Sequence, residues 1–140
     1  MYMEVNYFVI LLVTVVLMVL AMIWFGPLFW NLWMKIHGWE NMSKQELKEK
    51  DGNVWMLLAI ETIGTLVMAS VLAFFITQAP GYYELAIAFF IWIWFMLPGT
   101  ISGVIWGADK KQYQFQKIMI LSGFSLVALL IAALIFSIWL

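Results

Sequence analysis

The sequence predicts an all-α membrane protein with four transmembrane helices, and three observations lead to this prediction. Hydrophobic residues make up 66% of the 140 residues and charged residues only 11%, where soluble domains have roughly 45–50% and about 25%. Four apolar segments approach the ~20 residues that a helix needs to cross a bilayer. The charged residues gather between these segments. We expect one domain, residues 1–140, with helices at about 5–25, 54–77, 85–106 and 116–140.

The first helix leads into an aromatic segment that is interrupted by a Gly-Pro pair. After that pair, apolar residues recur at i, i+3, i+4 and i+7, which predicts a short helix lying in the membrane interface with Pro27 in its first turn. Tryptophan concentrates at headgroup depth, so we interpret the segment as an aromatic belt that anchors the first helix. A platform that stacks a ligand is the alternative. The residues of this interfacial motif are Trp24, Phe25, Gly26, Pro27, Phe29 and Trp33.

The loop at about 34–53 is the hydrophilic part of the chain. Ser43 and Glu46 have the spacing of a capping box, and Gly52 stands where a C-terminal cap is expected. These residues predict a short charged helix at about 44–50. Its charges alternate in sign, which is typical of a solvated face.

The placement of the lysines predicts the orientation of the chain. All seven basic residues are lysines, four in the first loop and three at the third, and the other loop and both ends have none. Because basic residues are retained on the cytoplasmic side, loops one and three should be cytoplasmic and both termini outside.

Glu61 in the second helix is the most unusual residue of the apolar segments. At ~1.5 Å per residue it lies roughly 10 Å inside the start of that helix, and acids at such depth usually face a protein interior or a water-filled cavity. The predicted orientation puts six hydroxyl residues in the same cytoplasmic leaflet. We therefore expect a polar cluster of Glu61, Thr62, Thr65, Thr100, Ser102, Ser122 and Ser125. The aromatic segment lies on the same side and is expected to cover this cluster as a lid.

The third helix contains Pro98, which should break it. Gly99, Gly103 and Gly107 then repeat every four residues and form a flat face of the kind at which membrane helices pack. Helix packing is the expected role of this face, and a hinge at the proline is the alternative.

The sequence carries no motif of an enzyme. It has one histidine, His37, and no cysteine, and the spacings of metalloproteases, serine hydrolases and phosphate loops do not occur. We expect no catalytic residue, no metal and no cofactor. The net charge of −1 also argues against binding of nucleic acid.

Several short motifs resemble one family. They are Trp24-Phe25-Gly26-Pro27-Leu28-Phe29, Trp33-Met34-Lys35, Gly38, Ser43-Lys44-Gln45-Glu46, Phe95-Met96-Leu97-Pro98, Trp106, Lys117 and Gly123. Together they are similar to the bacterial membrane protein family catalogued as domain of unknown function 1761. The resemblance implies a four-helix protein of the inner (cytoplasmic) membrane and brings no catalytic residue with it.

The sequence therefore predicts an integral membrane protein of unassigned function, and two roles compete. The first is a small structural, accessory or interaction protein, with the lipid bilayer and either further copies of the chain or a larger membrane complex as partners. The alternative is a small proton-coupled carrier that uses the intramembrane carboxylate of Glu61.

Overall fold

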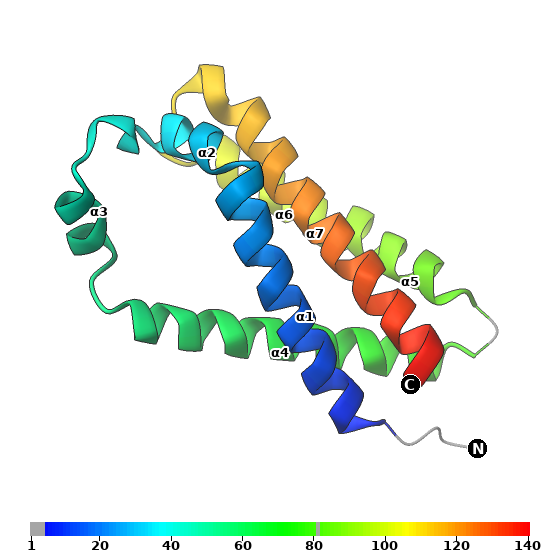
Figure 1. The fold of residues 1–140 in the computed structure, drawn as a ribbon. Helices are drawn as coiled ribbons and strands as arrows, with labels where there is room; N and C mark the ends of the chain where they lie inside the picture. The colour runs from blue at the N-terminus through cyan, green and yellow to red at the C-terminus, as the bar shows by residue number, and fades with distance from the viewer. Residues whose placement is uncertain (1–4, 81) are drawn as a thin grey trace.

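The computed structural model describes residues 5–80 and 82–140, and within them all regular structure is helical. Four helical segments are long and apolar enough to cross a membrane: Tyr7–Leu28, Val54–Gln78, Glu84–Ile105 and Lys111–Trp139. The predicted all-α fold with four long helices is therefore confirmed, and Figure 1 shows their arrangement.

The short helices lie between the first and second long segments, and two long segments contain a π-helical turn. In chain order the elements are α1 (Tyr7–Ile23), the π-helix η1 (Trp24–Leu28), α2 (Trp30–His37), the 3-10 helix η2 (Trp39–Asn41), α3 (Lys44–Asp51), α4 (Val54–Gln78), α5 (Glu84–Ile91), the π-helix η3 (Trp92–Met96), α6 (Leu97–Ile105) and α7 (Lys111–Trp139).

Side-chain caps explain where several helices begin. The Ser43 hydroxyl accepts from the Glu46 N–H at 3.2 Å, and the Glu46 carboxylate accepts from the Ser43 N–H at 3.3 Å. This is the predicted capping box of α3. The side chain of Asn53 caps α4 in the same way, accepting from the Met56 N–H at 3.3 Å. Each cap gives a partner to an N–H that the helix itself leaves unpaired.

The core lies where α1, α4, α5 and α7 converge, at the end of the molecule that carries both termini (Figure 1). Small residues allow the helices to approach closely there. Six alanines are at most 1% exposed: Ala69, Ala73, Ala88, Ala128, Ala132 and Ala133. Larger side chains, Val13, Leu17, Leu72, Leu129 and Phe136, fill the space between them.

Both prolines of the long segments lie in or just after π-helical turns. Proline has no N–H to donate, so the regular pattern of hydrogen bonds must change near it. Pro27 lies inside η1, where the Phe29 N–H donates to the Trp24 carbonyl, five residues back, at 3.2 Å. Pro98 follows η3, where the Leu97 N–H donates to the Trp92 carbonyl.

The break expected at the Gly-Pro pair is present, because the backbone of Gly26 is not helical, with φ −98° and ψ −106°. Pro27 follows this kink directly, within η1, and α2 begins at Trp30. The expectation for Pro98 is corrected. Pro98 does not break the third helix. The backbone stays helical from Glu84 to Ile105 because η3 absorbs the change in hydrogen bonding.

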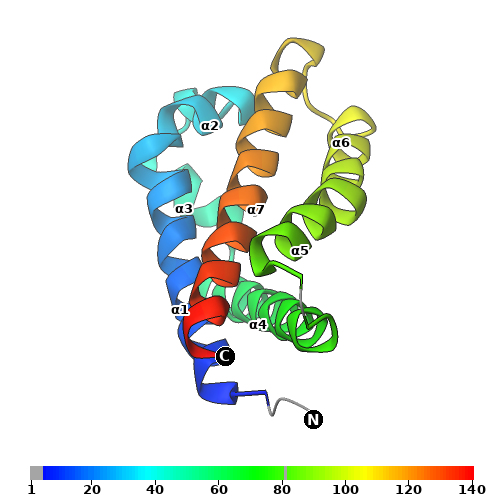
Figure 2. The ribbon, with the colours of Figure 1, turned by 90° about the vertical axis from the view of Figure 1, so that its right-hand side faces the viewer.

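The second long helix, α4, packs against the bundle over only part of its length. Every residue from Val54 to Gly64 is exposed, whereas Ala69, Leu72, Ala73 and Ile76 are buried. Figures 1 and 2 show that the first half of α4 extends away from α1 while its second half crosses beneath the bundle. The helices therefore diverge toward the start of α4, which is where Glu61 lies.

Candidate functional site

The divergence of α4 from α1 leaves two cavities that meet at Glu61. The inner cavity has a volume of about 260 Å³ and lies between α1, α4, η3 and α7. The residues on which its chemistry depends are Glu61, Gly64, Thr65, Met68, Met96, Phe124 and Ser125. The outer cavity, of about 430 Å³, is lined by Ala21, Phe25, Trp33, Glu61, Leu121 and Phe124. Among the described residues that line these two cavities, Glu61 alone carries a charge.

The position of Glu61 follows from the helical repeat of α4. Glu61, Gly64, Thr65 and Met68 are spaced at i, i+3, i+4 and i+7 and therefore share the face of α4 that lines the inner cavity. Ile60, Ile63 and Val67 are each at least 56% exposed and lie on other faces. Glu61 is itself exposed, and it lines both cavities on a helix whose other faces are apolar.

The carboxylate of Glu61 has no protein partner within the described part of the chain, where neither a hydrogen bond nor an ion pair reaches it. The hydroxyl of Thr65 donates to the main-chain oxygen of Glu61 at 2.9 Å, and it also lies 3.7 Å from the sulfur of Met18. An unpaired carboxylate at membrane depth is costly, and such residues usually mark functional sites.

Ser125 and Ser122 are tied to Trp92. The indole N–H of Trp92 donates to the Ser122 carbonyl at 2.9 Å and to the Ser125 hydroxyl at 3.1 Å, and that hydroxyl donates to the Ser122 carbonyl at 3.0 Å. The Ser122 hydroxyl is buried without a partner in the described residues. These serines therefore fasten η3 to α7, and Ser125 also forms part of the cavity wall.

The expected polar cluster is thus only partly assembled. Glu61, Thr65 and Ser125 line the inner cavity, and Ser122 lies one helical turn from Ser125. Thr62 is exposed and donates to its own helix, at the Leu58 carbonyl, at 2.7 Å. Thr100 and Ser102 do not line either cavity.

The interfacial motif divides between two sides of α7. Phe25 packs between Trp33 and Phe124, with ring centroids 5.0 and 5.3 Å away, and lines the outer cavity. Phe29 instead contacts Trp24, at 5.0 Å, and lines a separate apolar groove of about 400 Å³ along α7. Phe25 and Trp33 are therefore placed as the expected lid requires, and Phe29 is not.

Trp24 anchors the first long segment to α7. Its indole N–H donates to the Ile120 carbonyl at 3.1 Å, and its ring lies 3.2 Å from the point where a Cβ on Gly123 would stand. A side chain at this position would require the ring of Trp24 to shift. Gly26, next in the motif, has φ −98° and ψ −106° and marks the kink of η1.

The glycine face of α6 has no packing partner in the described part of the chain. A Cβ on Gly99 or Gly103 would meet nothing within 4 Å. A Cβ on Gly107 would meet main-chain oxygens of its own segment, the nearest being that of Gly103 at 3.0 Å. If this face packs against a helix, that helix lies outside the described residues.

His37 takes part in an aromatic stack beside α2. Its ring centroid is 4.4 Å from that of Trp33 and 4.6 Å from that of Trp39, and its Nδ1 lies 2.8 Å from the Trp33 carbonyl. The ammonium of Lys50 lies 3.7 Å from the Trp39 ring. The stack therefore ties α3 and η2 to α2.

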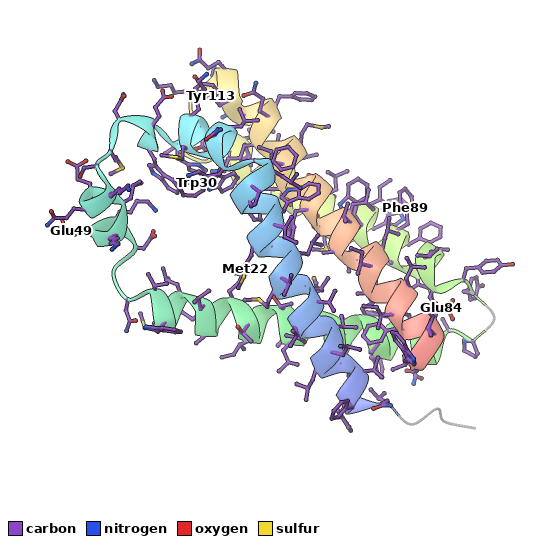
Figure 3. The ribbon with its side chains drawn as sticks, in the orientation of Figure 1. Met22, Trp30, Glu49, Glu84, Phe89 and Tyr113 are labelled. Carbon is purple, nitrogen blue, oxygen red and sulfur yellow. The ribbon has the colours of Figure 1, made fainter. Side chains whose placement is uncertain are left out.

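Sequence reasoning missed four residues of the site. Met68 could have been found, because it lies seven residues after Glu61 on the same helical face. Met96 and Phe124 come from other helices and line the inner cavity with Glu61, and Trp92 is bonded to Ser125; these positions depend on how η3 and α7 pack. Figure 3 draws the side chains along these helices.

Four helices of spanning length define a small helical membrane protein. A family model described as a protein of unknown function (DUF1761) matches residues 8–137, so the chain belongs to this family and the resemblance seen in its motifs is confirmed. No match was found among curated proteins or among solved structures.

Proposed function

We propose that this membrane protein works by binding other membrane helices, as a small structural or accessory subunit or as a homo-oligomer. The observation that carries the proposal is the open glycine face of α6, where a Cβ on Gly99 or Gly103 would meet nothing within 4 Å. In membranes, helices associate through small residues that let their backbones approach. A face of this kind that is unused within the chain is suited to a helix from outside it.

A test follows from the open space at these glycines. The Cβ of Gly99→Leu or Gly103→Leu meets no atom within 4 Å, so a loss of assembly is expected to arise between chains. Overpacking an interface costs about 1–3 kcal/mol, or roughly 5- to 150-fold in dissociation constant. Native mass spectrometry of protein purified in mild detergent should show an oligomer or a stoichiometric partner that is lost in both variants.

Ser102→Leu is the matched control, because Ser102 is also exposed but is turned by about 100° from Gly103 around α6. It should leave the assembly intact. A wild-type chain that is monomeric and brings no partner would contradict the proposal, and so would an assembly that both glycine variants retain.

In this proposal the chain lies in the inner membrane of a bacterium, with loops one and three in the cytoplasm and both termini outside. The seven lysines support this orientation. The arrangement of the helices agrees with it, since α2 and the turn before α7 lie together at the end opposite to the termini (Figure 1).

A proton-coupled carrier is the second candidate, and the cavities at Glu61 favour it. A carboxylate inside a membrane protein can bind a proton and a solute alternately. In proteoliposomes that enclose a pH-sensitive dye, external tetraphenylphosphonium should release protons through the wild type and not through Glu61→Gln. Proton movement that Glu61→Gln leaves unchanged would exclude this role for Glu61.

A further inference from the structure

The two cavities that meet at Glu61 combine one negative group with aromatic and thioether surfaces. The rings of Phe25, Trp33 and Phe124 line the outer cavity, and Met68 and Met96 line the inner one. Aromatic faces attract cations, most strongly where water is excluded, and methionine adapts to irregular apolar shapes. The walls therefore suit a ligand that has both a positive charge and an apolar body.

The charge of Glu61 is not balanced by a neighbouring cation in the described residues. The lysine nearest to the aromatic rings of the outer cavity is Lys117. Its ammonium lies 5.7 Å from the centroid of the Trp33 ring. That ammonium is already paired with Asp109 at 2.8 Å. A negative charge that lacks a partner in a region of low dielectric attracts a mobile cation more strongly than it would in water.

The other polar groups of the inner cavity do not suit a metal ion. The Thr65 hydroxyl is bonded to its own helix, and the Ser125 hydroxyl is bonded to Trp92 and to the Ser122 carbonyl. Glu61 supplies the one charged group of the inner cavity, and the two hydroxyls keep only the lone pairs that these bonds leave. Calcium and magnesium require about six or more oxygen ligands, so a large and weakly hydrated cation fits this site better than a metal.

We propose that these cavities bind a monovalent organic cation with an apolar body. The positive group lies beside Glu61, next to the rings of Phe25 and Phe124, and the apolar body occupies the inner cavity against Met68 and Met96. The combined space, about 260 and 430 Å³, is in the range of small-molecule sites. The inference deepens the carrier proposal by naming the class of its solute. Both rest on the carboxylate of Glu61, but this inference requires only that the cation binds, not that it is transported.

The test uses tetraphenylphosphonium as the cation and triphenylphosphine oxide as a neutral molecule of similar shape. Binding is measured by equilibrium dialysis against purified protein in a neutral detergent, with empty micelles subtracted. The wild type should bind the cation about 10-fold or more tightly than the neutral molecule, since only the cation gains from the carboxylate. Equal binding of the two would overturn the proposal, because the cavity would then recognise apolar shape alone.

Variants of Glu61 locate the site. Glu61→Gln keeps the shape and removes the charge, so it should weaken binding of tetraphenylphosphonium about 10-fold or more, while Glu61→Asp keeps the charge and should stay within about 3-fold. Glu84→Gln removes a carboxylate that does not line either cavity and should bind like the wild type. Wild-type binding by Glu61→Gln, or equal losses in Glu61→Gln and Glu84→Gln, would place the cation elsewhere.

The aromatic wall gives an independent check. Trp33→Leu and Phe25→Leu should each weaken binding of the cation about 3- to 10-fold and leave binding of the neutral molecule nearly unchanged. Each variant is first required to elute as one species with wild-type helix content. If the cation binds as described but moves no protons in proteoliposomes, the carrier proposal fails and this inference stands. If Glu61→Gln binds the cation as tightly as the wild type does, this inference fails, whether or not the protein forms an oligomer.

Discussion

Trp92 is held by two acceptors on α7, the Ser122 carbonyl and the Ser125 hydroxyl. Trp92→Phe removes the donor and keeps an aromatic ring. We expect it to lower the free energy of unfolding by about 0.5–1.5 kcal/mol, the usual net value of one hydrogen bond. Thermal unfolding in detergent measures this, with Trp94→Phe as the control, because Trp94 is 70% exposed. Equal effects of the two substitutions would show that the hydrogen bonds contribute nothing.

A side chain at Gly123 would weaken the contact that anchors the first long segment to α7. Gly123→Leu would push against the ring of Trp24, which lies 3.2 Å from the position of the new Cβ, and would weaken the bond from Trp24 to Ile120. The expected loss of stability is about 1–3 kcal/mol. Gly64→Leu is the control, because a Cβ there meets nothing within 4 Å. Removing the ring with Trp24→Ala in the same chain should relieve much of the effect of Gly123→Leu.

Among the elements, the connection between α6 and α7 depends on a partly buried ion pair. Asp109 and Lys117 are 2.8 Å apart, and their side chains are only 14% and 18% exposed. Asp109→Asn leaves the ammonium without its partner and should cost about 1–3 kcal/mol, less than a fully buried pair would. Thermal unfolding in detergent and the rate of proteolysis near residue 109 both report the change.

The ion pair between Lys50 and Asp51 is the matched comparison. Its distance is 2.6 Å, but the Asp51 side chain is 44% exposed, and exposed pairs contribute about 0–1 kcal/mol. Asp51→Asn should therefore have little effect. If the two substitutions destabilised the protein equally, burial would not be what gives the Asp109 pair its strength.

The sequence predicted the elements better than the turns inside them. Hydropathy located the four long helices, and the spacing of Ser43 and Glu46 predicted the start of α3. The effect of Pro98 could not be predicted, because a proline can either break a helix or shift its hydrogen bonds into a π-helical turn. Which outcome occurs depends on contacts such as those of Trp24 and Trp92 with α7, which join residues about 100 and 30 positions apart in the chain.

The candidate site was predictable only at Glu61 itself. A carboxylate in an apolar segment stands out in any sequence, and Thr65 follows from the helical repeat. The seven polar residues were grouped by their depth in the membrane, but depth does not determine the direction in which a side chain points. Thr62 has the expected depth but is exposed. Phe124 lines the inner cavity together with Glu61, and the sequence around Phe124 does not indicate this.

At the scale of the whole molecule, the orientation can be tested without interference from native thiols, since the chain has no cysteine. Single cysteines replace Gln45 in loop one, Tyr82 in loop two or Gln112 at the start of α7. An impermeant maleimide added to intact spheroplasts should label Tyr82→Cys alone, and all three should react after permeabilisation. Labelling of Gln45→Cys and Gln112→Cys in intact spheroplasts would reverse the orientation.

The divergence of α4 from α1 also affects the lipid around the protein. The helices are packed through alanines near Gln78 and stand apart near Val54, so once inserted the molecule takes up more area in one leaflet than in the other. Lateral pressure in the wider leaflet acts directly on the separation of these two helices. Changes in membrane curvature or in acyl-chain packing would therefore alter the volume of the cavities at Glu61 without any ligand being bound.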